Sequence, residues 1–293
     1  MRDGPWRRFD EFIAPGADRC RILESLLDEH GLRYGERCIA GNRHILLGPG
    51  PEAPDLEGPP GKTPGGTTLV AHYDRVRGSP GANDNSAAVF LLLETALALY
   101  REARQNWLII FTDKEELGPG GAIRDQGAYT LGRTLRDSGR GGGRFYIFDA
   151  CGVGDWIIIS TMTDYVMRGG EGAGFARIRR RTQQLRDRAL SVSRKLNLDR
   201  VLLAPVPFSD DLGFLRAGIG AQTITALPSA EANRLASELR NHPGAASALI
   251  TGGPGASALI PETWKTLNSP ADKKDRLTPE HYGQLLRFAL ALI

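Results

Sequence analysis

Short apolar runs alternate with longer helical patterns along most of this chain. The runs that predict buried strands are TTLVAHYD, NWLIIFTD, RFYIFDA, DWIIIST, RVLLAP and AQTITALP. Helices are predicted over 84–101, in a polar stretch that ends near 140, over 172–197, over 210–217 and in TPEHYGQLLRFALALI. Apolar strands that alternate with helices indicate an α/β fold with a mostly parallel sheet.

The first 66 residues follow a different pattern. Residues 7–30 are amphipathic and predict helix, whereas RCIAGNRHILLG predicts two short strands around a turn at Gly41-Asn42. A loop rich in Pro and Gly follows over 49–66. Because no linker divides the chain, we predict a single domain over 1–293, with residues 1–66 packing on its core.

A late segment, 241–263, is rich in small residues and contains ASALI twice, at 246–250 and 256–260. A repeat this short does not indicate a solenoid. We therefore expect a mobile loop or a simple hairpin in this part of the chain.

The composition is that of an ordinary globular protein, since 41% of the 293 residues are hydrophobic and 24% are charged. A net charge of +3 does not indicate nucleic-acid binding, and the basic run from Arg177 to Arg181 is best explained as a solvated helix face. No stretch approaches the roughly 20 apolar residues of a membrane helix, and the N-terminus lacks the apolar core of a signal peptide. Three cysteines without metal-type spacing favour a reducing compartment. We expect a cytoplasmic protein without a nucleic-acid or membrane partner; its oligomeric state stays open.

Polar side chains follow the apolar runs at the strand ends, where ligands gather in open α/β sheets. They are His72 and Asp74, then Asp84, then Glu115 and Glu116, and finally Asp149. Each has an ordinary structural explanation when taken singly; Asp84, between two asparagines, is typical of a helix N-cap. Together, however, such carboxylates would raise each other's pKa, and a bound cation removes that cost. One imidazole with several carboxylates suits zinc or another divalent metal.

Three segments carry a resemblance to a known family. AHYDRVRGSPGANDNSAAV, FTDKEELG and FDACG resemble the zinc aminopeptidase family of the bacterial leucyl aminopeptidases, whose fold glutaminyl cyclases share. The resemblance covers the chain from about residue 66 to its end. It implies a three-layer α/β/α sandwich around a mixed, mostly parallel central sheet, and a metal-dependent exopeptidase.

The resemblance also implies roles for single residues. The implied metal ligands are His72 and Asp149 for a first zinc, Glu116 for a second, and Asp84 between the two. Asp74 would orient His72 and fix its tautomer. Glu115 would be the general base that takes a proton from the metal-activated water.

The chain departs from the family pattern at two places. In TWKTLNSPADKKDRLTPEH, Asn268 stands where the family has its last histidine ligand, and Asp211 replaces a histidine in FSDDLGFLRAGIGA. An amide oxygen is a poor zinc ligand. Three interpretations stay open: the second metal is weak or absent, His242 substitutes for the missing ligand, or the second site takes Mg²⁺ or Mn²⁺.

Three hypotheses for function follow. The leading one is a metal-dependent hydrolase with one or two zinc ions that acts on a short peptide or an acylated amine. The second is a partly degraded relative that binds a peptide or a partner without catalysis, which Asn268 and Asp211 suggest. The third is a glutaminyl cyclase-like acyltransferase, which Asn268 weighs against, because that subfamily's single zinc uses the late histidine.

Overall fold

The computed structural model describes residues 4–50, 66–118, 120–168, 170–206, 209–251 and 255–293. Eight strands form one sheet in the order β1-β2-β4-β3-β5-β8-β6-β7. The strands are β1 (Tyr34–Ile39), β2 (Asn42–Leu47), β3 (Thr67–His72), β4 (Trp107–Thr112), β5 (Arg144–Phe148), β6 (Trp156–Ser160), β7 (Val201–Ala204) and β8 (Ala221–Leu227). The central strands β4, β3, β5 and β8 are parallel, whereas β1–β2, β2–β4 and β6–β8 are antiparallel. The predicted mixed, mostly parallel sheet is confirmed; the single-domain assignment stays a prediction.

Helices cover both faces of this sheet. The α-helices are α1 (Phe9–Ile13), α2 (Arg19–Glu29), α3 (Ala87–Arg101), α4 (Gly127–Asp137), α5 (Met162–Val166), α6 (Ala173–Lys195), α7 (Asp210–Ala217), α8 (Ser229–Asn241), α9 (Ala245–Thr251), α10 (Ala256–Leu259), α11 (Glu262–Lys265) and α12 (Tyr282–Leu292). Single helical turns are η1 (Gly4–Arg8), η2 (Ala82–Ser86), η3 (Ile123–Asp125), η4 (Lys274–Arg276) and η5 (Pro279–His281). None of the helices in the described ranges is long and apolar enough to cross a lipid bilayer.

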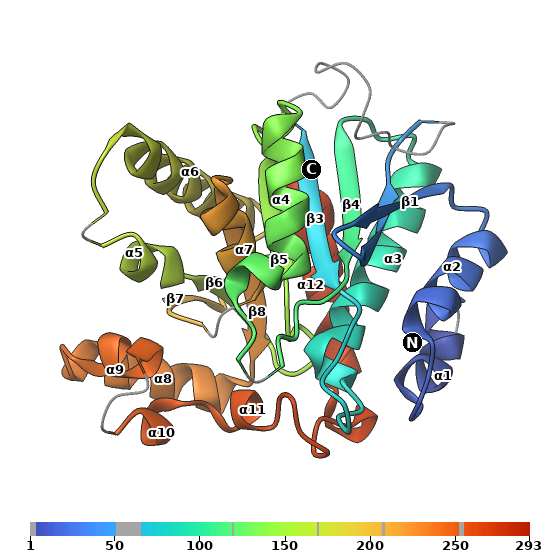
Figure 1. Cartoon of the computed structure of the whole chain (residues 1–293). Helices are drawn as coiled ribbons and strands as arrows, with labels where there is room; N and C mark the ends of the chain where they lie inside the picture. The colour runs from blue at the N-terminus through green and yellow to red at the C-terminus, as the bar shows by residue number, and fades with distance from the viewer. Residues whose placement is uncertain (1–3, 51–65, 119, 169, 207–208, 252–254) are drawn as a thin grey trace.

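The apolar runs of β3, β4 and β8 are buried on both faces, as expected for strands inside a parallel sheet. The last strand of the sheet, β7, is the exception, with Leu203 40% exposed. Along β3, Leu69 and Ala71 belong to the core shared with α3, α6 and α12, whereas Val70 belongs to the core under α4 and α7. Successive side chains of a strand point to opposite faces, so one short run serves both layers. Figure 1 shows α4 in front of the sheet and α3 with α12 behind it. The three-layer α/β/α prediction is confirmed.

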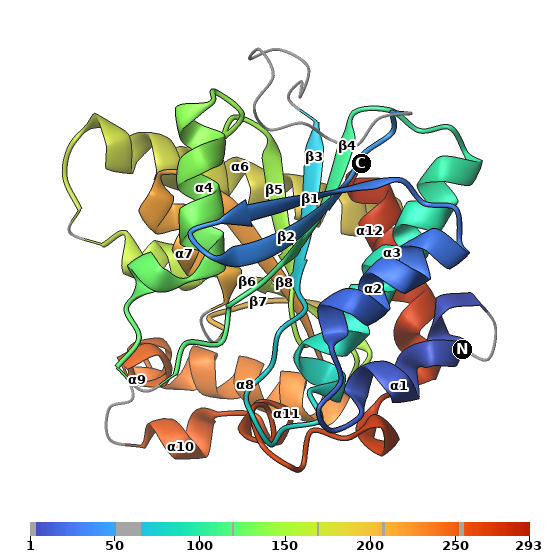
Figure 2. The same cartoon turned by 45° about the vertical axis from the view of Figure 1, so that its right-hand side comes forward.

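An aromatic cluster joins the N-terminal helices to the core. The ring of Phe90 on α3 has its centroid 5.2 Å from Trp6, 5.0 Å from Phe9 and 5.4 Å from Phe12. Trp6 also lies edge-on to Tyr282 of α12, at 5.0 Å. Figure 2 shows α1 and α2 beside α3 and the β1–β2 hairpin at the edge of the sheet. Offset and edge-to-face ring pairs add to the free energy of burial.

We expect Phe90→Ala to lower the free energy of unfolding by about 3–5 kcal/mol, because it removes the ring that three others contact. Urea unfolding followed by fluorescence measures this loss. Phe175→Ala is the matched control, because Phe175 is 42% exposed, and we expect it to change stability by about 0.5 kcal/mol or less. Equal effects of the two substitutions would contradict the assignment of Phe90 to the core.

The structure corrects several local predictions. Segment 241–263 is neither a mobile loop nor a hairpin over its described residues, because α9, α10 and α11 occupy it; residues 252–254 lie outside those residues. Alanine and leucine have high helix propensity, which the small-residue content concealed. The first hairpin turns at Ala40 and Gly41, which both have positive φ, rather than at Gly41-Asn42. The helix predicted over 7–30 is interrupted between α1 and α2, where Pro15 and Gly16 stand.

The helices at the C-terminal end of the chain frame one edge of the sheet. The parallel strands β3, β5 and β8 end at that edge, and α8, α10 and α11 run beneath it in Figure 1. The last helix, α12, lies elsewhere: its apolar residues are buried against α3 and α6. The carboxyl ends of β3, β5 and β8 therefore lie next to the helices α8, α10 and α11 (Figure 1).

Candidate active site

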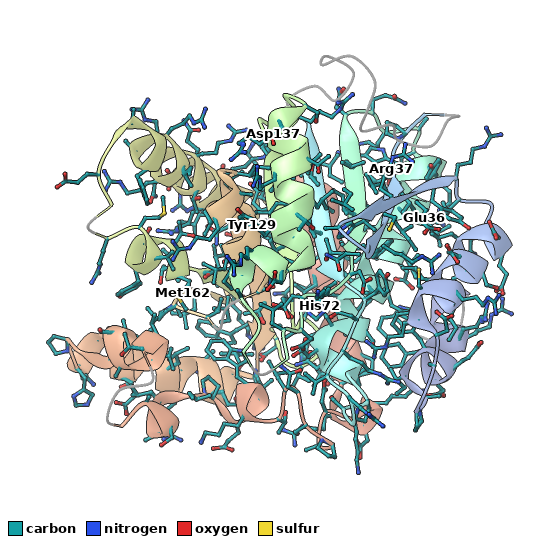
Figure 3. The ribbon with its side chains drawn as sticks, in the orientation of Figure 1. Glu36, Arg37, His72, Tyr129, Asp137 and Met162 are labelled. Carbon is teal, nitrogen blue, oxygen red and sulfur yellow. The ribbon has the colours of Figure 1, made fainter. Side chains whose placement is uncertain are left out.

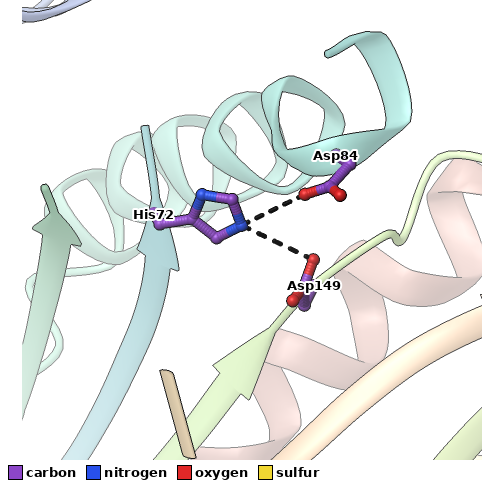
Figure 4. Close-up of side chains that lie close together, drawn as sticks. All are labelled: His72, Asp84 and Asp149. Carbon is purple, nitrogen blue, oxygen red and sulfur yellow. Dashed lines mark ion pairs between the residues drawn. The ribbon is translucent and has the colours of Figure 1, made fainter. Parts of the chain in front are cut away.

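A histidine and two aspartates meet at the carboxyl ends of neighbouring strands. His72 is the last residue of β3, Asp149 follows β5, and Asp84 lies in η2, just before α3. Nε2 of His72 lies 3.2 Å from Oδ1 of Asp84 and 3.7 Å from Oδ1 of Asp149 (Figure 4). The ligating atoms of the three side chains all lie within 4.8 Å of one another. Figure 3 places His72 inside the molecule, near the end of β3.

The nearest atoms of this cluster contact one another only as ion pairs. Neither Nε2 of His72 nor Oδ1 of Asp149 makes a hydrogen bond with any residue that the structure describes, although both are buried. A buried polar atom without a partner costs free energy unless a ligand satisfies it. The donor set of one imidazole nitrogen and two carboxylate oxygens is one that zinc prefers.

Asp74 contacts the other side of the histidine ring. Its Oδ1 lies 3.3 Å from Nδ1 of His72. The same carboxylate accepts hydrogen bonds from the backbone N–H of Glu115 (3.1 Å) and of Glu116 (3.0 Å). Burial opposes ionisation of Asp74, but His72 and these N–H groups outweigh it and lower its pKa. Asp74 therefore links the ring of His72 to the loop after β4.

Burial lowers the pKa of His72, but the carboxylates of Asp149, Asp74 and Asp84 outweigh it and raise that pKa well above its usual value. Burial also raises the pKa of Asp84, with help from the charge of Asp149.

Glu115 and Glu116 extend the acidic cluster. Each places a carboxylate oxygen within 4.8 Å of a ring nitrogen of His72 and of the other glutamate's oxygen. Burial, followed by the charge of Asp84, raises the pKa of Glu116 to about 8. Burial raises the pKa of Glu115 well above its usual value; the charge of His72 opposes this shift, and those of Asp210 and Asp149 add to it. So many buried carboxylates are poorly compensated by one imidazole, and a divalent cation would relieve them.

Asp84 is not a helix N-cap, so the ordinary explanation of its position is wrong. The N-cap of α3 is Ser86, and the side chain of Asp84 points to His72. The backbone N–H groups of Asn83 and Asp84 donate to the two carboxylate oxygens of Asp272, at 2.8 and 3.0 Å. Asp272 thereby fixes the backbone at Asp84, whose carboxylate contacts His72.

The flanking asparagines tie this segment to the end of β5. The side chain of Asn85 donates to the carbonyl of Phe148 (2.9 Å) and accepts from the N–H of Ala150 (3.2 Å). The Oδ1 of Asn83 accepts from the N–H of Gly152 at 2.7 Å. Since Asp149 lies between these contacts, the two amides tie the segment of Asp84 to that of Asp149.

Arg19 on α2 is a buried residue of the site that the sequence pattern did not reveal. Its guanidinium donates to the carbonyls of Tyr73, Asp74, Pro80 and Gly81 and to the hydroxyl of Ser86, at 2.8–3.2 Å. Burial, with the charge of Arg75, lowers its pKa to about 9. Arg19 thus braces the loop between His72 and Asp84. The sequence does contain a signal for this role, because Arg19 occupies a position on the apolar face of an amphipathic helix.

A cavity of about 340 Å³ opens over the cluster. Four carboxylates line it, those of Asp84, Glu115, Glu116 and Asp149. Its apolar walls come from Leu117, Ile123, Val206, Leu212, Trp264 and Leu267. The cavity is large enough for a small ligand and brings apolar and acidic surfaces together.

With this geometry established, comparison with known proteins identifies a related family. Residues 57–126 match the model of Peptidase family M28. The resemblance to zinc aminopeptidases is thereby confirmed. No curated protein sequence matches the chain.

Solved structures share the fold at low sequence identity. The chain is 15% identical to the glutaminyl cyclase of Porphyromonas gingivalis, with a TM-score of 0.62, and the match covers 100% of this chain and 97% of that one. The LapA aminopeptidase of Legionella pneumophila matches at 13% identity and a TM-score of 0.62, over 100% and 68% of the two chains. A zinc aminopeptidase from Bacillus subtilis matches at 18% sequence identity and a TM-score of 0.52, over 85% of this chain. This chain spans only about half (49%) of the length of that aminopeptidase. These similarities show the fold.

The two departures from the M28-like pattern differ in their position. Asn268 lines the cavity, as its place in the sequence implied. Asp211 is fully buried, accepts a hydrogen bond from the N–H of Ser209, and is absent from the cavity wall. Burial raises the pKa of Asp211 to about 6.

The structure does not bring His242 to the site. It follows α8, its side chain is 67% exposed, and its Nε2 lies 3.3 Å from Oε2 of Glu238. Its exposure and pairing give no support to His242 as a substitute ligand. Sequence reasoning also missed Gln126, whose side-chain amide donates to Glu115.

Proposed function

We propose that this protein is a metal-dependent hydrolase of the exopeptidase type, which removes residues from the N-terminus of a short peptide. The observation that carries the proposal is the cluster of His72, Asp84 and Asp149, with Glu115 and Glu116 beside it. The four carboxylates of this group line one cavity. The M28 match and the aminopeptidase fold support it.

Zinc fits the donor set, because the cluster offers an imidazole nitrogen and carboxylate oxygens, of which Nε2 of His72 and Oδ1 of Asp149 have no hydrogen-bond partner among the described residues. We propose His72, Asp84 and Asp149 as its ligands, with Glu116 available to a second ion. When bound, zinc lowers the pKa of a water molecule toward about 7 and polarises the carbonyl that is attacked.

The protein's own groups handle the proton and the substrate. Glu115 accepts a proton from the attacking water and donates it to the leaving amine. Asp74 keeps the ring of His72 and the Glu115–Glu116 loop in place through the contacts described above. The apolar walls around Trp264 exclude water and contact the side chain of the terminal residue.

The charge of the cavity favours a substrate with a free amine over an acylated one. Its described lining residues include four carboxylates and no Lys, Arg or His. A positively charged N-terminus is attracted to such a surface, whereas a neutral acylated amine is not.

The direct test is digestion of a mixture of short peptides by the zinc-loaded protein, followed by mass spectrometry. We expect stepwise loss of N-terminal residues from free peptides, no digestion of N-acetylated ones, and no activity after chelation. If no peptide or acylated amine is cleaved under any metal, the protein is a non-catalytic relative and the proposal is wrong.

We propose further that one zinc binds strongly, because Asn268 replaces the expected histidine and His242 lies elsewhere. Asn268→His should raise the metal content from one zinc per chain to two, measured by elemental analysis of protein prepared without chelator. The histidine supplies the nitrogen ligand that the amide cannot.

Asn197→His is the matched control for this substitution. Asn197 is exposed and, like Asn268, has a positive φ (53° against 59°), so both variants place histidine in the same backbone conformation. We expect Asn197→His to leave the metal content unchanged. Two zinc ions in the wild-type protein would contradict the one-metal proposal and leave the hydrolase proposal standing.

Cyclisation of N-terminal glutamine is the second candidate function. The observation that favours it is the match to the Porphyromonas gingivalis glutaminyl cyclase over nearly the full length of both chains. The peptide assay separates the two reactions, because cyclisation releases ammonia and keeps all residues, whereas hydrolysis releases the terminal amino acid.

We also propose a cytoplasmic location. All three cysteines are free, and Cys38 is exposed, which suits a reducing compartment. Fractionation of cells that produce the full-length protein tests this; recovery outside the cytoplasm would overturn it.

A further inference from the structure

Gln126 breaks a local rule at the start of α4. It is the N-cap residue, yet its side chain makes no capping hydrogen bond, and glutamine is not among the residues that favour this position. The side chain is only 3% exposed. A buried amide that does not cap its helix has another role, and such local conflicts concentrate at functional sites.

The amide is directed at Glu115. Its Nε2 donates to Oε1 of Glu115 at 3.2 Å and to the carbonyl of the same residue at 3.4 Å. The flipped amide would set an oxygen against two other acceptors, so the hydrogen-bond network supports this orientation. The N–H of Gly127 also donates to the carbonyl of Lys114, which ties the start of α4 to the same loop.

The fold leaves room for this amide. A Cβ atom on Gly213 of α7 would lie 2.4 Å from Oε1 of Gln126, so a larger residue there would collide with it. Gln126 also lines the cavity beside Glu115. The side chain is therefore held between α7 and the loop that carries the general base.

We propose that Gln126 is a positioning residue that fixes the carboxylate of Glu115 for proton transfer. The inference rests on the proposed function. A glutamate carboxylate turns easily about its last torsion. The hydrogen bond to Oε1 restricts this rotation and leaves Oε2 to accept the proton from water.

The neutrality of the donor matters for this role. A lysine or arginine would add a positive charge next to Glu115 and make it a weaker base. The glutamine amide supplies direction without a net charge, and it cannot titrate.

The first test replaces the amide and keeps the volume. We expect Gln126→Leu to lower kcat by about 10- to 100-fold, since small displacements of a catalytic group have effects of this size. KM and zinc content should stay within about twofold of the wild-type values, because Gln126 is proposed to act on the base alone. Gln222→Leu is the matched control. Gln222 is also buried and donates to a backbone carbonyl, that of Ser160, and we expect its loss to leave kcat unchanged.

A rescue experiment separates positioning from general packing. In Gln126→Gly, added acetamide should restore part of kcat, whereas acetone, which has a similar shape and no N–H donor, should not. Crystal structures of the zinc-loaded wild type and Gln126→Leu supply a readout without activity. We expect one carboxylate orientation for Glu115 in the wild type and several in the variant.

Wild-type kcat in Gln126→Leu, or equal rescue by acetone and acetamide, would overturn the inference. Glu115→Gln is measured in parallel to keep it distinct from the proposed function. If Glu115→Gln is inactive and Gln126→Leu is fully active, only the positioning role fails. If Glu115→Gln is active, or if the wild type cleaves nothing, the proposed function fails and the role of Gln126 with it.

Discussion

Glu115→Gln lowers kcat by about 10²- to 10⁴-fold, which is the usual contribution of a general base. The glutamine keeps the size of the side chain and cannot accept a proton from water. Because Glu115 is not among the proposed ligands, KM and zinc content change little. Steady-state kinetics on the peptide that the wild type cleaves fastest, with elemental analysis of both proteins, measures the effect.

Glu102→Gln is the control for this substitution. Its carboxylate is exposed, after the end of α3, and pairs only with Arg104 among the described residues. We expect its kcat to equal that of the wild type. A Glu115→Gln protein with full activity and full zinc content would show that another group takes the proton.

Asp84→Asn abolishes the stabilisation by zinc. A ligand that binds only the folded state stabilises the wild type by about 2.7 kcal/mol when its free concentration is 100 times the Kd. Asp84 contributes one of the three clustered donor atoms, and a neutral amide is a poor substitute for its carboxylate. Thermal unfolding with zinc and with chelator should show a large shift for the wild type and none for the variant.

The same variant makes a second, opposite prediction for the metal-free protein. Burial and the charge of Asp149 raise the pKa of Asp84, so its ionised form is unfavourable in the folded chain without metal. At pH 8, chelated Asp84→Asn should be at least as stable as the chelated wild type. If it is less stable, Asp84 serves mainly as a structural partner of His72.

The metal-free protein loses stability as the pH rises from about 5 to 8. In the folded chain the pKa of Glu116 is about 8 instead of 4.5, and burial raises that of Asp210 to about 7 instead of 3.8. The folded state therefore holds more protons than the unfolded state in this interval, and raising the pH favours unfolding. The raised pKa of His72 acts in the same direction.

Zinc reverses this dependence, because it replaces the protons as the compensating charge. The stabilisation by zinc should be larger at pH 8 than at pH 6. Urea unfolding at several pH values, with zinc and with chelator, measures both trends. A chelated protein whose stability rises between pH 5 and 8 would contradict the carboxylate cluster as described.

Much of the site could be predicted from the sequence, because the carboxyl ends of parallel strands lie on the same side of the sheet. Asp149 follows an apolar run, as do Glu115 and Glu116, and His72 ends one; buried runs of this kind indicate neighbouring parallel strands. That these residues lie close together can be inferred without knowing any side-chain contact. Asp84 was less certain, because a helix start also explains an aspartate.

The short helices α9, α10 and α11 differ from what the sequence predicted. The small residues of 241–263 carry no strong periodicity, so α9, α10 and α11 were interpreted as a loop or hairpin. Their packing under the edge of the sheet stabilises them, and helix stability in proteins comes mainly from such packing. His242 is one of three open explanations for the missing histidine ligand, and the structure places its side chain in solvent after the end of α8.

The sequence by itself predicted an α/β fold with a mostly parallel sheet and metal-binding residue types at its strand ends, since periodicity and residue type act locally along the chain; the three layers followed from the family resemblance. Only the tertiary structure showed that Arg19, Asp272 and Gln126 form hydrogen bonds with the segments that carry the cluster. In the contacts that reach the cluster, the partners are separated by 11 residues for Gln126 and Glu115, 54 for Arg19 and Tyr73, and 189 for Asp272 and Asn83. A hydrogen bond over such separations depends on how helices and loops pack, and no local pattern encodes that packing.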